Sequence, residues 1–292
     1  MLERLKRLDI LRCSECEGNI IFLDDYIECQ VCFTRFPIQN GVPLFSKENI
    51  DTKGSDTSEE KLILKSIKEK FPFLSKLNRL LQPPAFNSLI RGENRLNVYV
   101  EQAVKNPDAV ILDIGSGGNK IAPEVISIDI YNYPGVDLCM RADKICLKDN
   151  SVDMIISTSA IEHMTDTGRV FQEMQRILKP DGIIFITAPF IYPYHPEPFD
   201  FQRWSADGLK KAFPVCDCLE SGRLHGPHLA IYVVLSSYFA WMFSFGFYPV
   251  YLLLFALLQW IFLPFKILDN LHGIYQKATP LDCIVYYVGR KK

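Results

Sequence analysis

The stretch Ala109-Val-Ile-Leu-Asp-Ile-Gly-Ser-Gly-Gly118 joins an uninterrupted apolar run to a glycine-rich turn. A continuous apolar run of this length is typical of a strand that is buried on both faces of a parallel sheet. Glycines directly after such a strand allow the backbone to approach a bound nucleotide closely. The stretch therefore predicts an α/β fold whose first strand ends at a ligand-binding turn.

The short link to the second strand restricts the ligand. Only residues 119–124 separate the turn from Val125-Ile-Ser-Ile-Asp-Ile130, and Pro123 lies among them, so no proper helix can form there. Lys120 also stands where a dinucleotide fingerprint has its third glycine. A pyrophosphate is normally held by the missing helix, whereas S-adenosylmethionine carries no phosphate. The link therefore favours S-adenosylmethionine over NAD.

Strand-like and helical runs continue on both sides of this pair. Their alternation predicts a parallel sheet with helices packed on it. We expect strands at 137–143, 152–157, 182–188, 212–219 and 283–289, and helices at 61–81 (two short ones), 91–105 and 166–178.

Two acids follow the predicted second and third strands. Asp129 ends the second strand, where a carboxylate can accept hydrogen bonds from both hydroxyls of a ribose. Asp143 ends the third strand and can accept from an adenine amino group. Both positions lie at the edge of a parallel sheet where ligands bind.

These motifs occur in a fixed order with Asp149-Asn-Ser-Val-Asp-Met-Ile-Ile-Ser157, Ile161-Glu-His163 and Leu178-Lys-Pro-Asp-Gly182. Together they resemble a class I S-adenosylmethionine-dependent methyltransferase of the broad small-molecule type, over roughly residues 109–203. The resemblance implies a Rossmann-like sheet and S-adenosyl-L-methionine as cofactor. The alternatives are an α/β domain that binds another ligand or none, and a scaffold that binds the cofactor without turnover. The implied cofactor-binding residues are Asp113, Gly115, Ser116, Gly117, Asp129, Ile130, Ala142, Asp143 and Ser157, with the glycine turn on the methionine moiety.

Four cysteines form a cluster near the N-terminus. Cys13, Cys16, Cys29 and Cys32 have the spacing C-x2-C-x12-C-x2-C, which is typical of two knuckles that share one tetrahedral Zn²⁺. Four protein thiolates leave no open coordination position, so the predicted zinc is structural. Four unrelated cysteines, or a redox role for one pair, are the alternatives.

Residues 11–45 resemble, in addition, the short zinc-ribbon proteins that partner tRNA and release-factor methyltransferases. The resemblance includes the closing Pro37-Ile-Gln-Asn-Gly-Val-Pro43. It implies a structural metal and raises a tRNA or a protein as an alternative methyl acceptor.

The segment after the predicted fifth strand, Pro189 to Trp204, is dense in aromatic, acidic and basic groups. Similar segments follow this strand in methyltransferases that resemble those of polysaccharide and lipid biosynthesis. His195 is our first candidate for a general base, because its ordinary pKa lies near 6.5; it could also be a surface or packing residue. His163 is a second candidate, or a helix cap. Asp200 is a third, although its spacing also fits an ion pair with Arg203.

The run Leu229 to Phe265 contains no charged side chain. It is long enough for nearly two membrane crossings if it turns at residues 246–249. A single crossing is excluded if the strand at 283–289 must rejoin the sheet, so a re-entrant hairpin or helices in the membrane interface remain. The alternative is a buried helical pair in a homodimer or under the ribbon.

The chain of 292 residues divides into several expected segments. These are a zinc ribbon (8–46), a polar linker (47–60), a helical lead-in (61–108), the methyltransferase core (109–228), a hydrophobic helical insertion (229–268) and the final strand of the sheet (269–292).

Charge and the first residues guide the expected location and partners. The first seven residues carry charges where a secretory signal would be apolar, so we expect a cytoplasmic protein. A net charge of -2 gives no strong signal for nucleic acid. We expect a membrane-associated methyltransferase that acts on a small-molecule or lipid-linked acceptor, such as a lipid-linked glycan.

Overall fold

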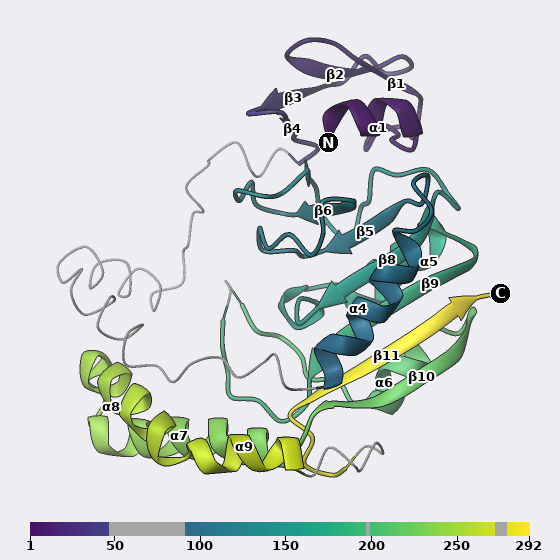
Figure 1. The fold of residues 1–292 in the computed structure, drawn as a ribbon. Helices are drawn as coiled ribbons and strands as arrows, with labels where there is room; N and C mark the ends of the chain where they lie inside the picture. The colour runs from purple at the N-terminus through teal and green to yellow at the C-terminus, as the bar shows by residue number, and fades with distance from the viewer. Residues whose placement is uncertain (47–90, 197–198, 272–278) are drawn as a thin grey trace.

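The computed structural model describes residues 1–46, 91–196, 199–271 and 279–292. The expected linker at 47–60 and the two helices expected at 61–81 lie outside these ranges. The described residues form two sheets and a layer of apolar helices (Figure 1).

The larger sheet has seven strands in the order β10-β11-β9-β8-β5-β6-β7. Strands β5 to β9 are parallel, and β11 runs antiparallel between β9 and β10. The bounds are β5 Ile111–Ile114, β6 Val125–Asp129, β7 Leu138–Cys139, β8 Val152–Thr158, β9 Leu178–Pro189, β10 Cys216–His225 and β11 Ile284–Lys291.

Strand β5 lies at the centre of the parallel part because its apolar side chains face covered surfaces on both sides. Ile111 packs with Val100 of α4 (Arg91–Ala103) on one face of the sheet. Leu112 and Ile114 pack on the other face, which α5 (Thr167–Ile177) and α6 (Ala206–Ala212) cover. The chain leaves β5 for β6 on one side and reaches β8 on the other, so the carboxyl end of β5 is a topological switch point, where α/β sheets bind ligands.

Helix α5 and strand β11 confirm the helix expected at 166–178 and the strand expected at 283–289. Two other strands differ from the expected bounds. Asp166 caps α5 by accepting a hydrogen bond from the backbone of Arg169 at 3.0 Å. The strand expected at 137–143 is wrong beyond β7, because the chain turns after it. The strand expected at 212–219 is also displaced: residue 212 still belongs to α6, and β10 begins at residue 216.

The N-terminal module covers the β7 edge of the large sheet. It contains α1 (Leu2–Leu8) and an antiparallel sheet of β1 (Ile20–Phe22), β2 (Tyr26–Cys29), β3 (Arg35–Gln39) and β4 (Val42–Pro43). The backbone of Phe45 donates to the Cys139 carbonyl at 2.8 Å, and that of Lys148 donates to Ile10 at 2.8 Å. Leu5 and Phe36 share one apolar cluster with Leu138. The module therefore protects a strand edge that would otherwise be open.

Three apolar helices lie at the other end of the molecule from this module (Figure 1). They are α7 (Pro227–Ser244), α8 (Tyr248–Ile261) and α9 (Leu263–Leu271), inserted between β10 and β11. Asp269 of α9 accepts hydrogen bonds from the backbones of Gly226 at 2.8 Å and His228 at 3.1 Å, and so caps the start of α7. Within the described ranges, no helix combines the length and the apolar character needed to cross a bilayer.

Candidate cofactor and acceptor site

The glycine turn after β5 adopts a backbone that only glycine accepts without strain. Gly115, Gly117 and Gly118 have φ values of 76°, 58° and 79°. A Cβ atom on Gly115 would lie 2.6 Å from Cβ of Ala160, and one on Gly118 would lie 2.6 Å from the Pro134 carbonyl oxygen. The turn is therefore both left-handed and tightly packed against Ala160 and Pro134.

Two polar groups at this turn lack a hydrogen-bond partner within the part of the chain that the structure describes. They are Oδ1 of Asp113 and Oγ of Ser116, both buried. Burial raises the pKa of Asp113 to about 7, and the Asp129 carboxylate adds to this, against Lys120. Unpaired buried polar groups are costly. The amino-acid part of S-adenosylmethionine, with its ammonium and carboxylate, would supply the missing partners.

Asp129 is held by the backbone on both oxygens. Its Oδ2 accepts from the Gly117 backbone at 2.9 Å and its Oδ1 accepts from Tyr131 at 2.9 Å. Burial raises its pKa despite these bonds. Each carboxylate oxygen keeps a second lone pair, so the fixed carboxylate can still accept from ribose hydroxyls.

The other residues predicted to bind the cofactor differ in their burial and in their hydrogen bonds. Asp143 lies in the turn beyond β7, not at a strand end, and pairs with Arg141 at 2.7 and 2.8 Å, which lowers its pKa. The Ser157 hydroxyl is fully buried and donates to the Ile114 carbonyl at 2.9 Å, so it ties β8 to β5 rather than facing solvent. Ile130 and Ala142 are half-buried neighbours of Asp129 and Asp143.

The raised pKa of Asp113 gives a pH dependence of stability. The folded chain keeps this proton up to about pH 7, whereas an unfolded Asp releases it near pH 4. We therefore expect the free energy of unfolding to fall as the pH rises across this window, by at most about 1.4 kcal/mol per pH unit. Asp113→Asn should remove this contribution in urea titrations at pH 5, 6 and 7, while the exposed Asp25→Asn should not. An equal pH slope in Asp113→Asn and the wild type would contradict it.

Both predicted histidines meet at one buried carboxylate. Glu162 belongs to the short helix η3 (Ile161–His163), which follows β8. Its side chain is fully buried, and neither oxygen has a hydrogen-bond partner among the described residues. Nε2 of His163 lies 3.9 Å from its Oε1, and Nε2 of His195 lies 3.8 Å from the same atom. Sequence reasoning missed Glu162, although its position after the fourth parallel strand marks the same edge of the sheet.

The opposite nitrogen of each imidazole faces an acceptor. Nδ1 of His195 lies 3.1 Å from the Pro193 carbonyl and 3.2 Å from Oδ2 of Asp200. Nδ1 of His163 lies 2.5 Å from the Phe199 carbonyl. Burial lowers the pKa of His195, but the groups of Glu162, Pro193 and Asp200 outweigh it and raise the pKa above its ordinary value.

Asp200 forms the ion pair that its spacing allowed. Arg203 donates to it through both Nη atoms, with Nη2 at 2.7 Å, and the His195 backbone donates to it at 2.9 Å. Burial raises the pKa of Asp200, but Arg203 and His195 outweigh this effect and lower it to about 2. Asp200 thus stays charged and fixes the loop that carries His195.

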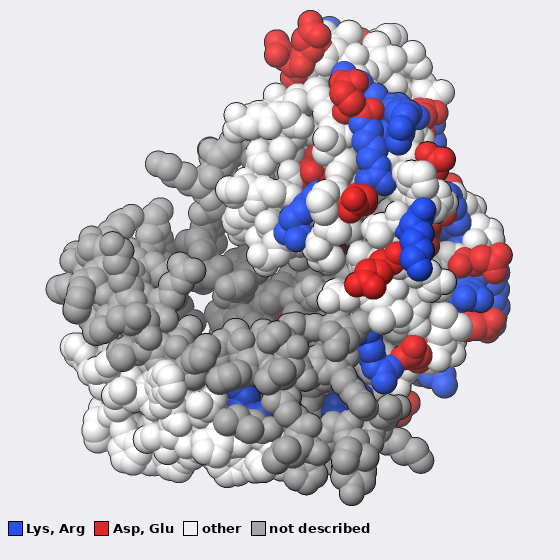
Figure 2. All heavy atoms as spheres, viewed as in Figure 1, with Lys and Arg blue, Asp and Glu red and all other residues white. Residues whose placement is uncertain are grey.

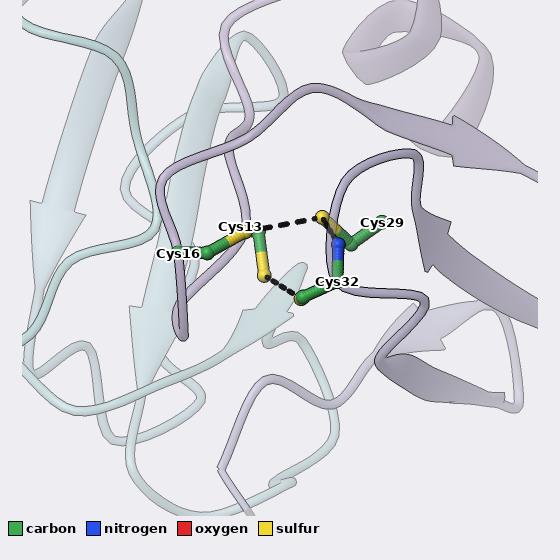
Figure 3. Close-up of side chains that lie close together, drawn as sticks. All are labelled: Cys13, Cys16, Cys29 and Cys32. Carbon is green, nitrogen blue, oxygen red and sulfur yellow. Dashed lines mark hydrogen bonds between the residues drawn. The ribbon is translucent and has the colours of Figure 1, made fainter.

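The four cysteines converge on a common point (Figure 3). Sγ of Cys13 lies 3.6 Å from that of Cys32, and Sγ of Cys16 lies 3.4 Å from that of Cys29. All four sulfur atoms lie within 4.8 Å of one another. Tetrahedral zinc with bonds of about 2.3 Å holds its sulfur ligands about 3.8 Å apart, so the cluster is compatible with one zinc ion.

The apolar helices adjoin the loop that carries His195. Tyr232 of α7 is buried in a cluster with Ile191 and Tyr192 of that loop. The Tyr192 ring meets the His195 ring edge to face at 4.8 Å between centroids. A continuous apolar path therefore leads from the helical layer to the histidines.

Comparison with known proteins identifies the central segment. Residues 112–186 match the family model described as a methyltransferase domain. A protein of Mycobacterium tuberculosis named "Probable S-adenosylmethionine-dependent methyltransferase" is 28% identical over 129 residues, which are 37% of this chain and 47% of that protein. A Mycolicibacterium smegmatis protein of the same description is 30% identical over 110 residues, 34% of this chain and 42% of that one. The chain thus spans less than half the length of these relatives.

Solved structures of low similarity include a phosphoethanolamine N-methyltransferase of Haemonchus contortus in complex with S-adenosyl-L-methionine, with 17% identity and a TM-score of 0.40 over 63% of this chain and 48% of that chain. Another is an S-adenosylmethionine-dependent methyltransferase from Mesorhizobium loti, with 12% identity and a TM-score of 0.36 over 62% and 90%.

Proposed function

We propose, from the methyltransferase domain that residues 112–186 form, that this chain transfers a methyl group from S-adenosylmethionine to a lipid or lipid-linked glycan at a membrane surface. The observation that best supports cofactor binding is the structure of the turn after β5. There Oδ1 of Asp113 and Oγ of Ser116, which lack a hydrogen-bond partner among the described residues, lie beside Asp129 at the switch point of the sheet. When bound, the cofactor supplies an activated methyl group.

The protein's own groups have separate tasks in this reaction. Asp113 and Ser116 bind the amino-acid part of the cofactor, and Asp129 orients its ribose. Methyl transfer needs in-line placement of the acceptor and removal of its proton. We assign the activation of the acceptor for this loss of its proton to the cluster of Glu162, His163 and His195, which lies at the same edge of the sheet as the glycine turn. Asp200 positions His195 there.

A zinc ion bound by the four cysteines would stabilise the whole molecule, because the module shares its core with β7. We expect one zinc per chain by elemental analysis of freshly purified protein. The double variant Cys16→Ser and Cys32→Ser should lose it and unfold at a lower temperature, while Cys218→Ser should keep it. Purified wild-type protein without zinc would contradict this assignment.

The packing of α7 supports membrane association. The side chains that α7 buries are mostly small, namely Ala230, Ser236, Ala240 and Ser244. The Ser236 hydroxyl is satisfied within the helix by the carbonyl four residues earlier. Small residues inside and large apolar residues outside are typical of helices that pack within lipid.

The outer surface of α7 and α8 is apolar and aromatic. Phe245 is 91% exposed and Trp241 is 66% exposed. Figure 2 shows charged side chains gathered over the sheet and the N-terminal module, while the described part of the helical layer is nearly free of them on this face. Exposed patches of this kind mark membrane or protein contacts, and Trp and Tyr prefer membrane interfaces. The large exposed side chains are Val234, Tyr238, Trp241, Phe243, Phe245, Phe247, Val250, Leu253, Leu257, Trp260 and Ile261.

We expect the wild-type chain to float with anionic phospholipid vesicles in a density gradient. The triple variant Trp241→Asp, Phe245→Asp and Leu257→Asp should remain in the soluble fraction, because a charge costs about 2.5–3.5 kcal/mol at bilayer depth. The matched control is the double variant Phe33→Asp and Val98→Asp, which replaces exposed apolar side chains outside α7 and α8 by charged ones. This variant should still float. Wild-type protein that stays soluble as a monodisperse dimer would instead favour the helical face as a contact between two copies.

The same vesicles test the function itself. Methyl transfer from labelled cofactor to extracted lipid in vesicles should be lost in the triple variant and retained in the control. An RNA or protein acceptor is the second candidate, supported by the zinc ribbon. However, the ribbon lies on β7, and β6, β5 and β8 separate it from β9, which leads to the His195 loop. Equal transfer by the wild type and the triple variant would favour this candidate.

A further inference from the structure

We propose that Glu162, His163 and His195 bind a divalent transition-metal ion that activates the acceptor. One carboxylate oxygen and two imidazole nitrogens lie within 4.8 Å of one another. Two histidines and one carboxylate are a ligand set for ions such as Mn²⁺, Fe²⁺ or Zn²⁺. This ion is distinct from the zinc of the four cysteines. Only its role in the reaction rests on the proposed function.

The distances suit such an ion after small side-chain rotations. Bonds of about 2.1 Å place neighbouring ligand atoms about 3.0 Å apart in an octahedral site and about 3.4 Å apart in a tetrahedral one. The two Nε2 atoms lie 3.8 and 3.9 Å from Oε1 of Glu162. Each of these two pairs therefore needs to close by less than about 1 Å.

The protons of the imidazoles point away from the proposed ion. Each Nδ1 lies at hydrogen-bond distance from a backbone carbonyl, that of Pro193 or that of Phe199. A neutral imidazole that donates from Nδ1 presents the lone pair of Nε2 on its other side. Metal-binding histidines are usually oriented by such a bond to a carbonyl or carboxylate. In each neutral imidazole, the carbonyl beside Nδ1 therefore favours the tautomer that binds metal.

The carboxylate favours a cation at this position. Glu162 is fully buried, and neither of its oxygens has a hydrogen-bond partner among the described residues. In that tautomer the two Nε2 lone pairs would face the carboxylate and repel it, whereas a cation between the three groups attracts all of them. The buried and unpaired side chain of Glu162 thus points to an ion.

The site is open toward solvent and close to the glycine turn. The His163 side chain is 16% exposed and that of His195 is 33% exposed, so further coordination positions face outward. Ala160, two residues before Glu162, is the residue against which Gly115 packs. The proposed ion therefore lies beside the end of the cofactor site that holds the methionine moiety.

The ion would act on an acceptor hydroxyl. Coordination lowers the pKa of a hydroxyl, so its proton passes to water before the transfer. An electron pair of the resulting alkoxide then forms the new bond to the methyl carbon, while the carbon–sulfur bond breaks and its electron pair stays on sulfur. The products are a methyl ether and S-adenosylhomocysteine. A hydroxyl with a neighbouring oxygen, as in a sugar, suits the open positions because both oxygens can coordinate.

Mn²⁺ tests the site without interference from the four thiolates, which are soft ligands. The full chain, holding a single zinc ion per chain by elemental analysis, is titrated with Mn²⁺ and the free ion is measured by electron paramagnetic resonance. We expect one Mn²⁺ per wild-type chain, and affinities at least tenfold lower in Glu162→Gln and in His195→Gln. The exposed Asp207→Asn should bind as the wild type does. Circular dichroism and S-adenosylhomocysteine binding show whether each variant is folded.

The possible outcomes test the proposed metal site and the proposed function independently. Wild-type protein that binds no Mn²⁺, or folded Glu162→Gln and His195→Gln variants that bind it as tightly as the wild type, would overturn the site. If Mn²⁺ binds as expected and its removal leaves methyl transfer unchanged, the proposed role of the ion is wrong. If Mn²⁺ binds through these residues and no acceptor is methylated, the metal site stands and the proposed function fails.

Discussion

Replacing His195 by Ala is expected to slow methyl transfer by about 10²–10⁴-fold while the affinity for S-adenosylmethionine stays within about twofold. His195 lies in the loop after β9 and contacts Glu162, Pro193 and Asp200. None of these residues belongs to the glycine turn. The substitution should therefore slow the activation of the acceptor and leave cofactor binding unchanged.

Turnover at saturating acceptor and cofactor affinity by calorimetry measure the two effects separately. Tyr194→Phe is the matched control, because Tyr194 is the exposed neighbour of His195 in the same loop. A wild-type rate in His195→Ala would remove His195 from the reaction. A loss of cofactor affinity equal to the loss in rate would show that the loop holds the cofactor instead.

Replacing Asp129 by Ala is expected to weaken S-adenosylmethionine binding at least tenfold. A hydrogen bond to a charged acceptor contributes about 1.5–3 kcal/mol, and the ribose offers two. The substitution also removes the acceptor for the backbones of Gly117 and Tyr131. The turn that faces the cofactor would therefore lose its support at the same time.

Calorimetric titration with S-adenosylhomocysteine measures this effect. Asp129→Asn keeps one acceptor oxygen and should fall between the wild type and Asp129→Ala. Asp143→Asn should have a smaller effect than Asp129→Ala, because both oxygens of Asp143 already accept from Arg141. Unchanged affinity in Asp129→Ala would place the cofactor elsewhere.

The sequence predicts the centre of the fold because local chemistry determines it. The apolar run before Gly115 is short and ends at glycines, which favours a doubly covered strand, and Asp166 marks the start of α5 as an N-cap. The last strand was also predictable, because its apolar residues follow a long insertion and must be buried. These elements depend on patterns within a few neighbouring residues.

The acceptor cluster could be predicted only in part, because its residues come from separate segments. Glu162 follows β8 and His195 follows β9, and their convergence depends on the pairing of those two strands. A glutamate within an apolar stretch is the one local signal, since such a group is rarely buried without a partner. The docking of the N-terminal module on β7 depends in the same way on long-range contacts, such as that of Phe45 with Cys139.

The structure of the helical insertion could likewise be predicted only in part from the sequence. The absence of charge from 229 to 265 predicts an apolar layer, but not which side chains face outward. The spacing of Ser236, Ala240 and Ser244 at intervals of four residues contains the signal for the inner seam. The capping of α7 by Asp269 could not be predicted, because 41 residues separate the bonded groups of His228 and Asp269.

The most direct test of the central claim is methyl transfer itself. The purified chain, loaded with zinc and supplied with Mn²⁺, is incubated with methyl-labelled S-adenosylmethionine and with lipid, RNA and protein extracts in separate reactions. We expect label in the lipid extract with the wild type and, at a cofactor concentration near its Kd, much less with Asp129→Ala. Label in the RNA or protein extract alone, or tight cofactor binding without label in any extract, would contradict the account.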